Sequence, residues 1–374
     1  MDAARLRDSF AAVAAHGDEV PLFFYSDLFL KHPQVRDLFP VSMTAQRAHL
    51  AAALAKIAAG AGDPAQLTAF LRDLGRDHRK FGALAEHYDA VGASLLATLE
   101  HFAGPGWTPE LAADWAEAYQ LAASVMTAAA ADDEQRRPAC WQATVTAFER
   151  RGPEIAVLTV RPDPALDYQP GQSVAVETPA RPRLWRYYSM ASPPRPDGLL
   201  EFHVRLIDGG AVSMALTAGA ITGTTLRLGP PVGSLTYTPG TGRGLLLIAG
   251  STGLAPLKAI LGQVAALPDP PRTDLLFAAR TAEGLYDLDH LDKLAAASPW
   301  LTITPAVTCG PPPASHPHAR HGPLPALVTA HASPPRDAYL AGPADMVTAA
   351  AAALTTAGLP PDHIHTENFG WSEP

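Results

Sequence analysis

Apolar positions in the first third of the chain recur at spacings of three and four residues, the period of an amphipathic helix. Alanine-rich stripes of this kind fill residues 1–131, and HGDEVP, KHPQ, GAGDP and GPGWTPE interrupt them with helix stop and start signals. Leu71, Leu74, His78 and Phe81 share one such stripe, which places His78 on a buried face. We therefore predict an all-helical domain over residues 1–133.

The hydrophobic period changes after the charged segment ADDEQRRPACW. Short apolar runs follow, separated by proline and glycine: ATVTAF, EIAVLTV, SVAVET, LLEFHVRLI and TTLRLG. In LLEFHVRLI, apolar residues from Leu200 to Leu206 alternate with Glu201, His203 and Arg205, so we expect one buried face and one face in water. Several strands at this spacing predict an antiparallel β-barrel over residues 138–239.

The last part of the chain alternates short buried strands with helical stretches. LLLIAG, DLLFAAR and AYLAGP are each followed by a helical pattern, which predicts an α/β domain of Rossmann type with a parallel sheet over residues 243–374. Gly250 and Gly253 follow the first of these strands and Gly342 ends the last. Glycines at such turns either pack helix on strand or let backbone amides approach a pyrophosphate. Two such ends at one sheet edge favour a nucleotide crevice.

Charge and composition restrict the partners. The formal net charge of −9 argues against nucleic acid or an anionic membrane as the main partner. No apolar run approaches the roughly 18 residues that span a bilayer, and MDAARLRDSF carries charges where a signal peptide needs an apolar core. We therefore expect a cytoplasmic protein without a membrane span. Cys140 and Cys309 alone provide no disulfide framework.

Two motifs in the barrel segment point to a flavin. LWRYYSMASPP, at residues 184–194, sets an arginine, a tyrosine and a serine at a strand end, which by itself is compatible with simple strand packing. Together with GGAVSMAL, at residues 209–216, it resembles the flavin-binding domain of the ferredoxin–NADP reductase family. The resemblance implies that Tyr188 and Ser189 line the flavin ring of FAD and that Arg186 reaches a phosphate. It also implies that the turn from Gly210 to Ser213 supports the pyrophosphate through its amides.

A helical domain in front of such a reductase resembles the flavohaemoglobins, which are nitric oxide dioxygenases, over essentially the whole chain. FFYSDLF, RDLFP, MTAQRAHL and LGRDHRKFG carry the resemblance in the helical part. It implies that Tyr25 is the distal tyrosine that hydrogen-bonds O₂, that Phe39 packs on the porphyrin, and that Gln46 is the distal glutamine. It also implies that His78 is the axial ligand of haem b. In the C-terminal TENFGW, Phe369 matches the aromatic residue that covers the isoalloxazine ring.

The same resemblance implies a tyrosine and a carboxylate near the proximal histidine. Tyr88 matches the tyrosine, ten residues after His78. Asp132 holds the carboxylate position, on the stripe through Val125 and Ala129. Asp133 and Glu134 are the alternatives. A carboxylate bonded to the second imidazole nitrogen raises the basicity of the ligand. Aspartate is one methylene shorter than glutamate, so the sequence leaves open which carboxylate, if any, lies beside His78.

These resemblances imply an enzyme that passes electrons from NAD(P)H through FAD to haem and converts nitric oxide and O₂ to nitrate. Its partners are then the small molecules O₂, nitric oxide and NAD(P)H. Two alternatives stay open: a haem-based gas or redox sensor, and an NAD(P)H reductase for another electron acceptor. Arg280 and Thr281 follow the second strand of the nucleotide domain, where a 2′-phosphate would sit, but an arginine there is also a common surface residue. Both NADH and NADPH remain candidates.

Overall fold

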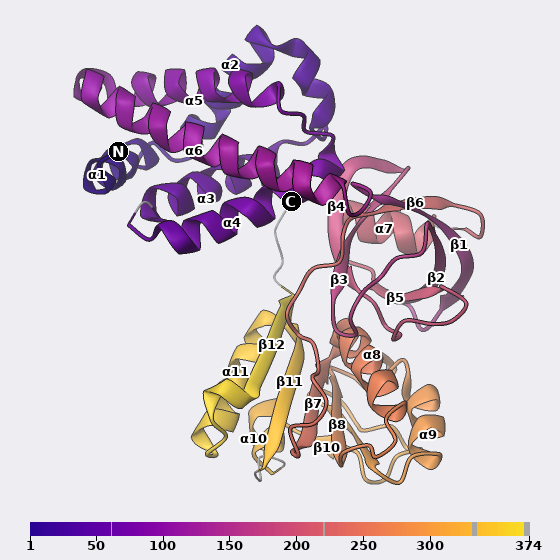
Figure 1. The fold of residues 1–374 in the computed structure, drawn as a ribbon. Helices are drawn as coiled ribbons and strands as arrows, with labels where there is room; N and C mark the ends of the chain where they lie inside the picture. Colours follow the sequence, from indigo (N-terminus) through magenta and orange to yellow (C-terminus); the bar gives the residue numbers. More distant parts are fainter. Residues whose placement is uncertain (61, 220, 331–334, 370–374) are drawn as a thin grey trace. The chain divides into compact units, whose positions relative to one another are not determined.

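The computed structural model describes residues 1–60, 62–219, 221–330 and 335–369, and in them the chain forms two compact units (Figure 1). The first unit extends from Met1 to Cys140, and the second begins at Trp141. Within the described ranges, no helix is both long and apolar enough to cross a membrane.

The first unit is entirely helical. Its helices are α1 (Ala3–Ala14), α2 (Glu19–Lys31), α3 (Thr44–Gly60), α4 (Pro64–His78), α5 (His87–Ala103) and α6 (Pro109–Glu134), with short 3₁₀ turns η1 (Pro33–Leu38), η2 (Arg79–Phe81) and η3 (Gly104–Gly106). Thr108 caps α6, because its hydroxyl accepts the Leu111 amide at 3.2 Å, and Pro109 opens the helix.

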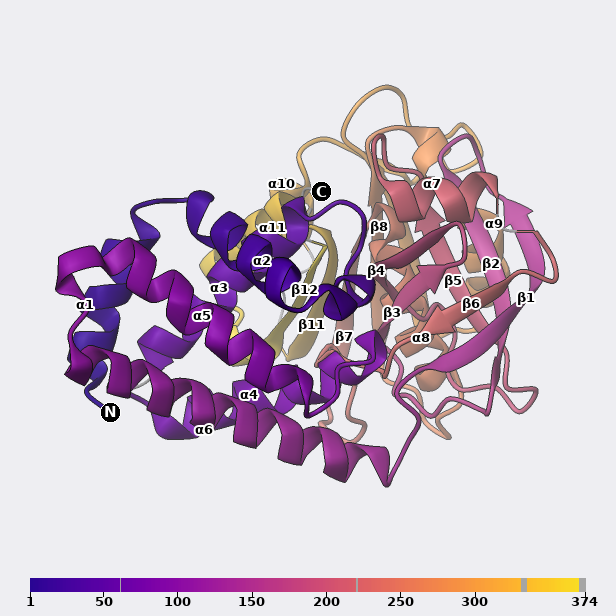
Figure 2. The ribbon, with the colours of Figure 1, turned by 90° about the horizontal axis from the view of Figure 1, so that it is seen from above.

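Helices α4 and α6 lie against each other in this unit (Figure 2). Gly75 makes the close approach possible, because a Cβ atom there would lie 2.3 Å from the Met126 carbonyl oxygen. A larger apolar core, which includes Leu6, Leu28 and Trp115, packs the other helices together. The predicted all-helical domain is confirmed.

The second unit begins with a curled antiparallel sheet. Its strands are β1 (Trp141–Arg150), β2 (Ile155–Asp163), β3 (Ser173–Thr178), β4 (Arg181–Ser189), β5 (Leu200–Arg205) and β6 (Thr225–Leu228), in the order β4-β3-β6-β1-β2-β5. An isolated bridge joins Met190, beside β4, to Phe202 of β5, so the two edge strands meet. The helix α7 (Ala211–Ala218) buries Val212 and Leu216 in the core of the sheet. The predicted antiparallel barrel is confirmed.

A doubly wound α/β layer completes the second unit (Figure 1). Its parallel strands are β7 (Gly244–Gly250), β8 (Thr273–Ala279), β9 (Leu301–Val307), β10 (Arg320–His321), β11 (Arg336–Pro343) and β12 (Ile364–Phe369), in the order β10-β9-β8-β7-β11-β12. One face is covered by α8 (Leu254–Ala265) and α9 (Leu288–Ala296), and the other by α10 (Leu324–Thr329) and α11 (Ala344–Thr356). The chain reverses its direction across the sheet between β7 and β11, where such folds bind their ligands.

Strand β5 departs from its predicted exposure. The sequence predicts a wet face with Glu201, His203 and Arg205, yet His203 is only 3% exposed. The prediction is wrong for this residue because α8 and the segment before α9 supply side chains that cover it.

Candidate functional site

Three of the residues predicted for the distal side of a haem lie together in the first unit. Tyr25, on α2, stacks on Phe29 with 5.7 Å between ring centroids and meets the ring of Phe39 edge-on at 5.5 Å. Its hydroxyl donates to the backbone carbonyl of Gln46, near the start of α3, over a long 3.4 Å. The structure therefore brings Tyr25, Phe39 and Gln46 into one cluster.

The Tyr25 phenol is suited to donate a hydrogen bond to a ligand. Burial raises the pKa of Tyr25 to about 12, so the hydroxyl keeps its proton at neutral pH. Hydroxyl donors usually bond at 2.5–3.0 Å, so the 3.4 Å contact with Gln46 is weak. An acceptor at ordinary hydrogen-bond distance from the Tyr25 hydroxyl would receive a stronger hydrogen bond, which would replace the long bond to the Gln46 carbonyl.

His78 is the last residue of α4 and its imidazole has a defined tautomer. Its Nδ1 lies 2.8 Å from the Leu74 carbonyl oxygen. Because a carbonyl only accepts, Nδ1 carries the proton and Nε2 keeps its lone pair. Burial lowers the pKa of His78, which favours this neutral form. No described residue bonds Nε2, so the donor set fits an axial haem ligand.

The proximal partners are only partly where the sequence placed them. Tyr88, in the first turn of α5, is partly buried, and burial raises its pKa. Asp132 is half exposed and pairs with Arg136 at 2.8 Å, and no hydrogen bond joins it to His78 within the described ranges. The buried residue is its neighbour Asp133, which binds Arg79 and Arg137.

The stripe prediction for this end of α6 is thus wrong by one residue. It does not bring Asp132 inward, and Asp133 is already held by two arginines. A carboxylate beside the proximal histidine stays an untested prediction.

Two buried polar atoms, one of them in the flavin motif, lack hydrogen-bond partners in the described part of the chain. They are Oγ of Ser189, at the end of β4, and Oε2 of Glu367, on β12. Burial raises the pKa of Glu367 to about 7, and the nearby Ser189 hydroxyl partly opposes this rise. Buried polar groups of this kind need a partner, which the edge of a flavin ring would supply. The residues present therefore fit FAD.

The sequence did not single out Glu367. It lies two residues before Phe369, in the motif TENFGW that was noted only for its aromatic residues. Phe369 is the last residue of β12, where it is opposite Pro343 in register, and its side chain lies outside what the structure describes. A carboxylate on the strand next to β11 was the available signal for Glu367.

The other predicted flavin residues have structural roles already. Tyr188 packs against the barrel core, and burial raises its pKa. Arg186 donates to the Trp185 carbonyl at 2.9 Å. Ser213 donates to the Gly210 carbonyl at 2.9 Å and accepts the Ile207 amide at 3.2 Å, so its hydroxyl holds the turn before α7. Their contacts with FAD stay predictions.

The three glycines predicted for the nucleotide meet at the carboxyl ends of β7 and β11. A Cβ atom on Gly250 would lie 2.2 Å from the Met346 sulfur, and one on Gly253 would lie 2.1 Å from the Ala341 carbonyl. Gly342 has a φ of 150° and closes on the Gly250 backbone. The clashes at Gly253 and Gly342 are with backbone atoms, so packing alone requires these two glycines, and the contact of all three with NAD(P)H stays a prediction.

The turn between them has a second feature. Ser251 has a φ of 53°, in the left-handed region that favours glycine. Strained backbone of this kind is concentrated at ligand-binding turns. Its position at the switch point of the sheet matches where doubly wound folds bind dinucleotides.

The three parts of the chain define a globin joined to a flavin- and nicotinamide-dependent oxidoreductase. Family models match in the same order: Globin at residues 22–126, Oxidoreductase FAD-binding domain at 149–237 and Oxidoreductase NAD-binding domain at 247–352. A flavohemoprotein of Bordetella pertussis is 30% identical over 384 residues, covering 95% of this chain and 94% of the relative. The chain belongs to the flavohemoprotein family, and its cofactors are haem, FAD and NAD(P)H.

Solved structures agree with this fold. A flavohemoglobin from Malassezia yamatoensis, with bound FAD and heme, has a TM-score of 0.78 at 17% identity and covers 98% of both chains. The FAD/NAD-binding domain of a nitric oxide dioxygenase from Vibrio cholerae has a TM-score of 0.54 at 21% identity, covering 62% of this chain and 98% of that one.

Proposed function

We propose that this protein is a nitric oxide dioxygenase, with haem, FAD and NAD(P)H held by residues 1–133, 138–239 and 243–374. Family membership and the name of the Vibrio cholerae neighbour support this activity. The observation that carries it is Tyr25: a buried, protonated phenol whose hydroxyl makes one long bond among the described residues, in one cluster with Phe39 and Gln46.

The balanced reaction takes two electrons from each NAD(P)H. One electron is used for each nitric oxide and O₂ that combine, so one NAD(P)H with two of each gas gives two nitrate ions, NAD(P)⁺ and one proton. Bound FAD and haem supply the electron transfer and the affinity for O₂. The protein residues bind, orient and polarise, and none of them is consumed.

In the globin unit, two side chains have opposite tasks. His78 offers the lone pair of Nε2 because Nδ1–H is fixed on the Leu74 carbonyl. The Tyr25 phenol donates a hydrogen bond to O₂ and keeps its proton, because its pKa lies far above neutral. O₂ is thereby retained until nitric oxide arrives.

In the reductase unit, Ser189 and Glu367 offer polar atoms to the flavin ring. With a pKa of about 7, Glu367 exchanges its proton near neutral pH, which suits a group beside a flavin that gains and loses protons as it is reduced and oxidised. Tyr188 and Arg186 lie on the same strand as Ser189, β4, and extend the proposed flavin-binding edge of that strand.

The test is NAD(P)H oxidation by the loaded protein in aerated buffer, with and without nitric oxide. We expect nitric oxide to accelerate the oxidation and nitrate to accumulate. A sensor would bind the gas without sustained turnover. A reductase for another acceptor would oxidise NAD(P)H at the same rate with or without nitric oxide, and either result would refute the proposal.

A further inference from the structure

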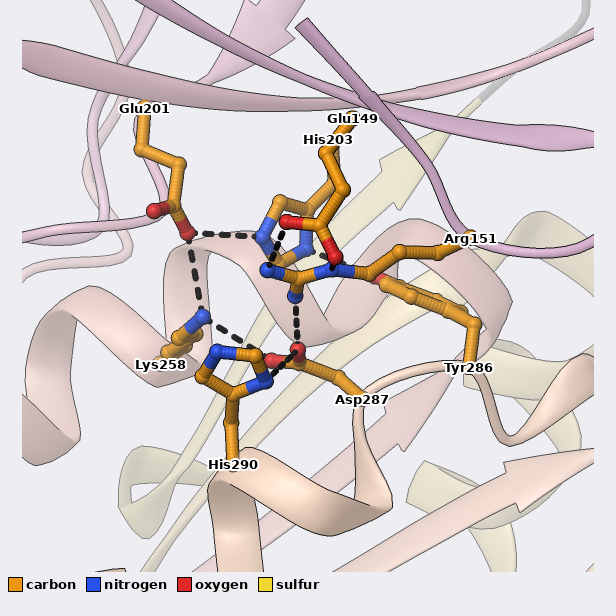
Figure 3. Close-up of polar contacts among 8 residues, drawn as sticks. All are labelled: Glu149, Arg151, Glu201, His203, Lys258, Tyr286, Asp287 and His290. Atoms are coloured by element: carbon orange, nitrogen blue, oxygen red, sulfur yellow. Dashed lines mark hydrogen bonds and ion pairs between the residues drawn. The ribbon is translucent and has the colours of Figure 1, made fainter. Parts of the chain in front are cut away.

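A polar network, buried at its centre and exposed at Glu149 and His290, joins the barrel to the α/β layer inside the second unit (Figure 3). We call it the junction network; its members come from β1 and the residue that follows it, from β5, from α8, and from α9 with the segment before it. They are Glu149, Arg151, Glu201, His203, Lys258, Tyr286, Asp287 and His290. The sequence did not predict a functional role for any of them, and none belongs to the sites described above.

The centre of the network is His203, whose hydrogen bonds fix its tautomer. Its Nε2 lies 2.9 Å from the Glu201 carboxylate, and its Nδ1 lies 2.7 Å from the Tyr286 hydroxyl. Burial raises the pKa of Tyr286 well above its usual value, so the phenol keeps its proton and donates to Nδ1. The imidazole, whose own pKa burial lowers, therefore donates from Nε2 to Glu201.

Two cations, Lys258 and Arg151, each pair with a carboxylate of the barrel and with Asp287 of the α/β layer. Lys258 Nζ lies 3.0 Å from Glu201 on the barrel and 2.9 Å from Asp287 on the α/β layer. Arg151, which follows β1, pairs with Glu149 at 2.8 Å and also with Asp287. The Asp287 side chain is fully buried, so its charge depends on these partners.

Such a network specifies one arrangement of the elements it joins. An apolar contact tolerates sliding, but a buried carboxylate that loses its cation keeps a charge that neither water nor a partner stabilises. The Tyr286 hydroxyl bonds His203 of β5, and Lys258 of α8 pairs with Glu201 of the same strand, so a shift of β5 against these segments would leave buried groups unpaired. The network therefore fixes the register between the two halves of the unit.

Both sides of the network are close to the predicted cofactor positions. Lys258 lies about one helical turn into α8, which begins directly after the glycine turn at Gly250–Gly253. Phe202, between Glu201 and His203, bridges to Met190, the residue after Ser189. Strand β5 also contacts the turn η4 (Ser251–Gly253).

We propose that Glu201, His203, Lys258 and Asp287 are positioning residues for hydride transfer: they hold the dinucleotide turn at a fixed distance from the flavin strand, so that a bound nicotinamide would be aligned with a bound flavin. The step is the two-electron transfer of one hydride from NAD(P)H to FAD, giving NAD(P)⁺ and the reduced flavin anion. This inference rests on the reductase half of the proposed function and is independent of nitric oxide.

The test is anaerobic stopped-flow reduction of FAD by NADH and by NADPH in the full-length holoprotein. Lys258→Met removes the bridging cation and keeps most of the side-chain volume. Arg205→Met is the matched control, because Arg205 lies on β5 with Glu201 and His203 and, among the described residues, pairs with the half-exposed Glu154 at 3.0 Å, outside the junction network. Lys258→Arg restores the charge and serves as the rescue.

We expect Lys258→Met to slow flavin reduction at saturating NAD(P)H by on the order of tenfold, since misplacement of reacting atoms by a fraction of an ångström costs this much. The half-saturation concentration and the FAD content should change less than twofold, and the charge-transfer absorbance between nicotinamide and flavin should weaken. Lys258→Arg should recover most of the rate, and Arg205→Met should match the parent protein.

A rate for Lys258→Met within threefold of the control, at full FAD content, would overturn the proposal. If Lys258→Met is recovered without flavin, His203→Gln decides by the same criteria, because glutamine retains a donor for Glu201 and loses the imidazole acceptor of the Tyr286 hydroxyl. A parent protein whose flavin neither nicotinamide reduces would refute the reductase half itself. A parent that is reduced but ignores nitric oxide would refute only the dioxygenase reaction.

Discussion

Replacing Tyr25 by phenylalanine removes one hydroxyl and little else. The ring is retained against Phe24, Phe29 and Phe39, whose centroids lie 4.9, 5.7 and 5.5 Å from that of Tyr25. The hydroxyl makes a single 3.4 Å bond to the Gln46 carbonyl, so the protein without O₂ loses little when it is removed. The substitution therefore acts almost entirely on the state that holds O₂.

The size of the effect follows from the bond that is lost. A hydrogen bond to a ligand that carries partial negative charge contributes about 1.5–3 kcal/mol. Since each 1.4 kcal/mol corresponds to about a factor of ten, O₂ should leave the variant roughly 10- to 100-fold faster. Because the pKa of Tyr25 is about 12, the difference should not depend on pH across the neutral range.

Stopped-flow measurement of O₂ release from the reduced protein tests this prediction. Tyr119→Phe is the control, because Tyr119 is another tyrosine of the globin unit whose hydroxyl donates to a backbone carbonyl, that of Tyr88. The control should release O₂ at the parent rate. If Tyr25→Phe and the parent agree within twofold, Tyr25 is not the donor and the distal part of the proposal fails.

Four further variants test other parts of the site. His78→Ala should abolish haem binding and leave FAD content and NAD(P)H oxidation with an artificial acceptor unchanged, as absorption spectra and ferricyanide assays would show; haem retained with the same axial-ligand spectrum would contradict the assignment. Ser189→Ala should weaken FAD binding or slow its reduction without altering O₂ release, and unchanged flavin occupancy and kinetics would count against it. Glu367 has a pKa raised from 4.5 to about 7, so its stabilising effect is present below pH 4.5 and is lost as pH rises through 7. Glu367→Gln should therefore flatten the fall in unfolding temperature of the FAD-free protein over this range, and an identical slope would refute the buried carboxylic acid. Gly75→Ala should destabilise the globin unit by about 1–3 kcal/mol through its clash with the Met126 backbone, measured by denaturant unfolding; unchanged stability would show that α4 and α6 can separate.

The fold class could be predicted because its signals are local. Thr108 and Pro109 predict the start of α6, and the structure shows the capping hydrogen bond from the Leu111 amide to the Thr108 hydroxyl. Alternating residues in LLEFHVRLI predict a strand, and Leu200, Phe202 and Val204 are buried in the barrel core. These patterns depend on neighbours within one turn or one strand, which sequence displays directly.

The end of α6 shows how a correctly recognised helical period can still select the wrong residue. The predicted stripe passes through Val125 and Ala129 to Asp132, but the buried positions are Ala122, Met126, Ala129 and Asp133. A helix of 3.6 residues per turn alternates steps of three and four, and a step of three after Ala129 selects Asp132 where the buried face takes a step of four. The stripe therefore points to Asp132, while the buried acidic residue at this end of α6 is Asp133.

The residues that sequence missed depend on contacts between distant segments. His203 lies on the polar side of its strand, and it is buried because Tyr286, 83 residues later, covers it. Glu367 lies on β12, which pairs with β11. Only the folded structure shows that its Oε2 is buried near Ser189 and lacks a hydrogen-bond partner among the described residues. No local pattern distinguishes such groups from surface charges.

The central claim is that this chain adds both atoms of O₂ to nitric oxide with electrons from NAD(P)H. The most direct measurement is mass spectrometry of the nitrate formed by the holoprotein from nitric oxide, NAD(P)H and isotopically heavy O₂. The account predicts nitrate that carries two heavy oxygen atoms, with two nitrate ions formed for each NAD(P)H oxidised. Nitrate with one heavy atom, or nitrite as the main product at the rate seen without protein, would contradict it.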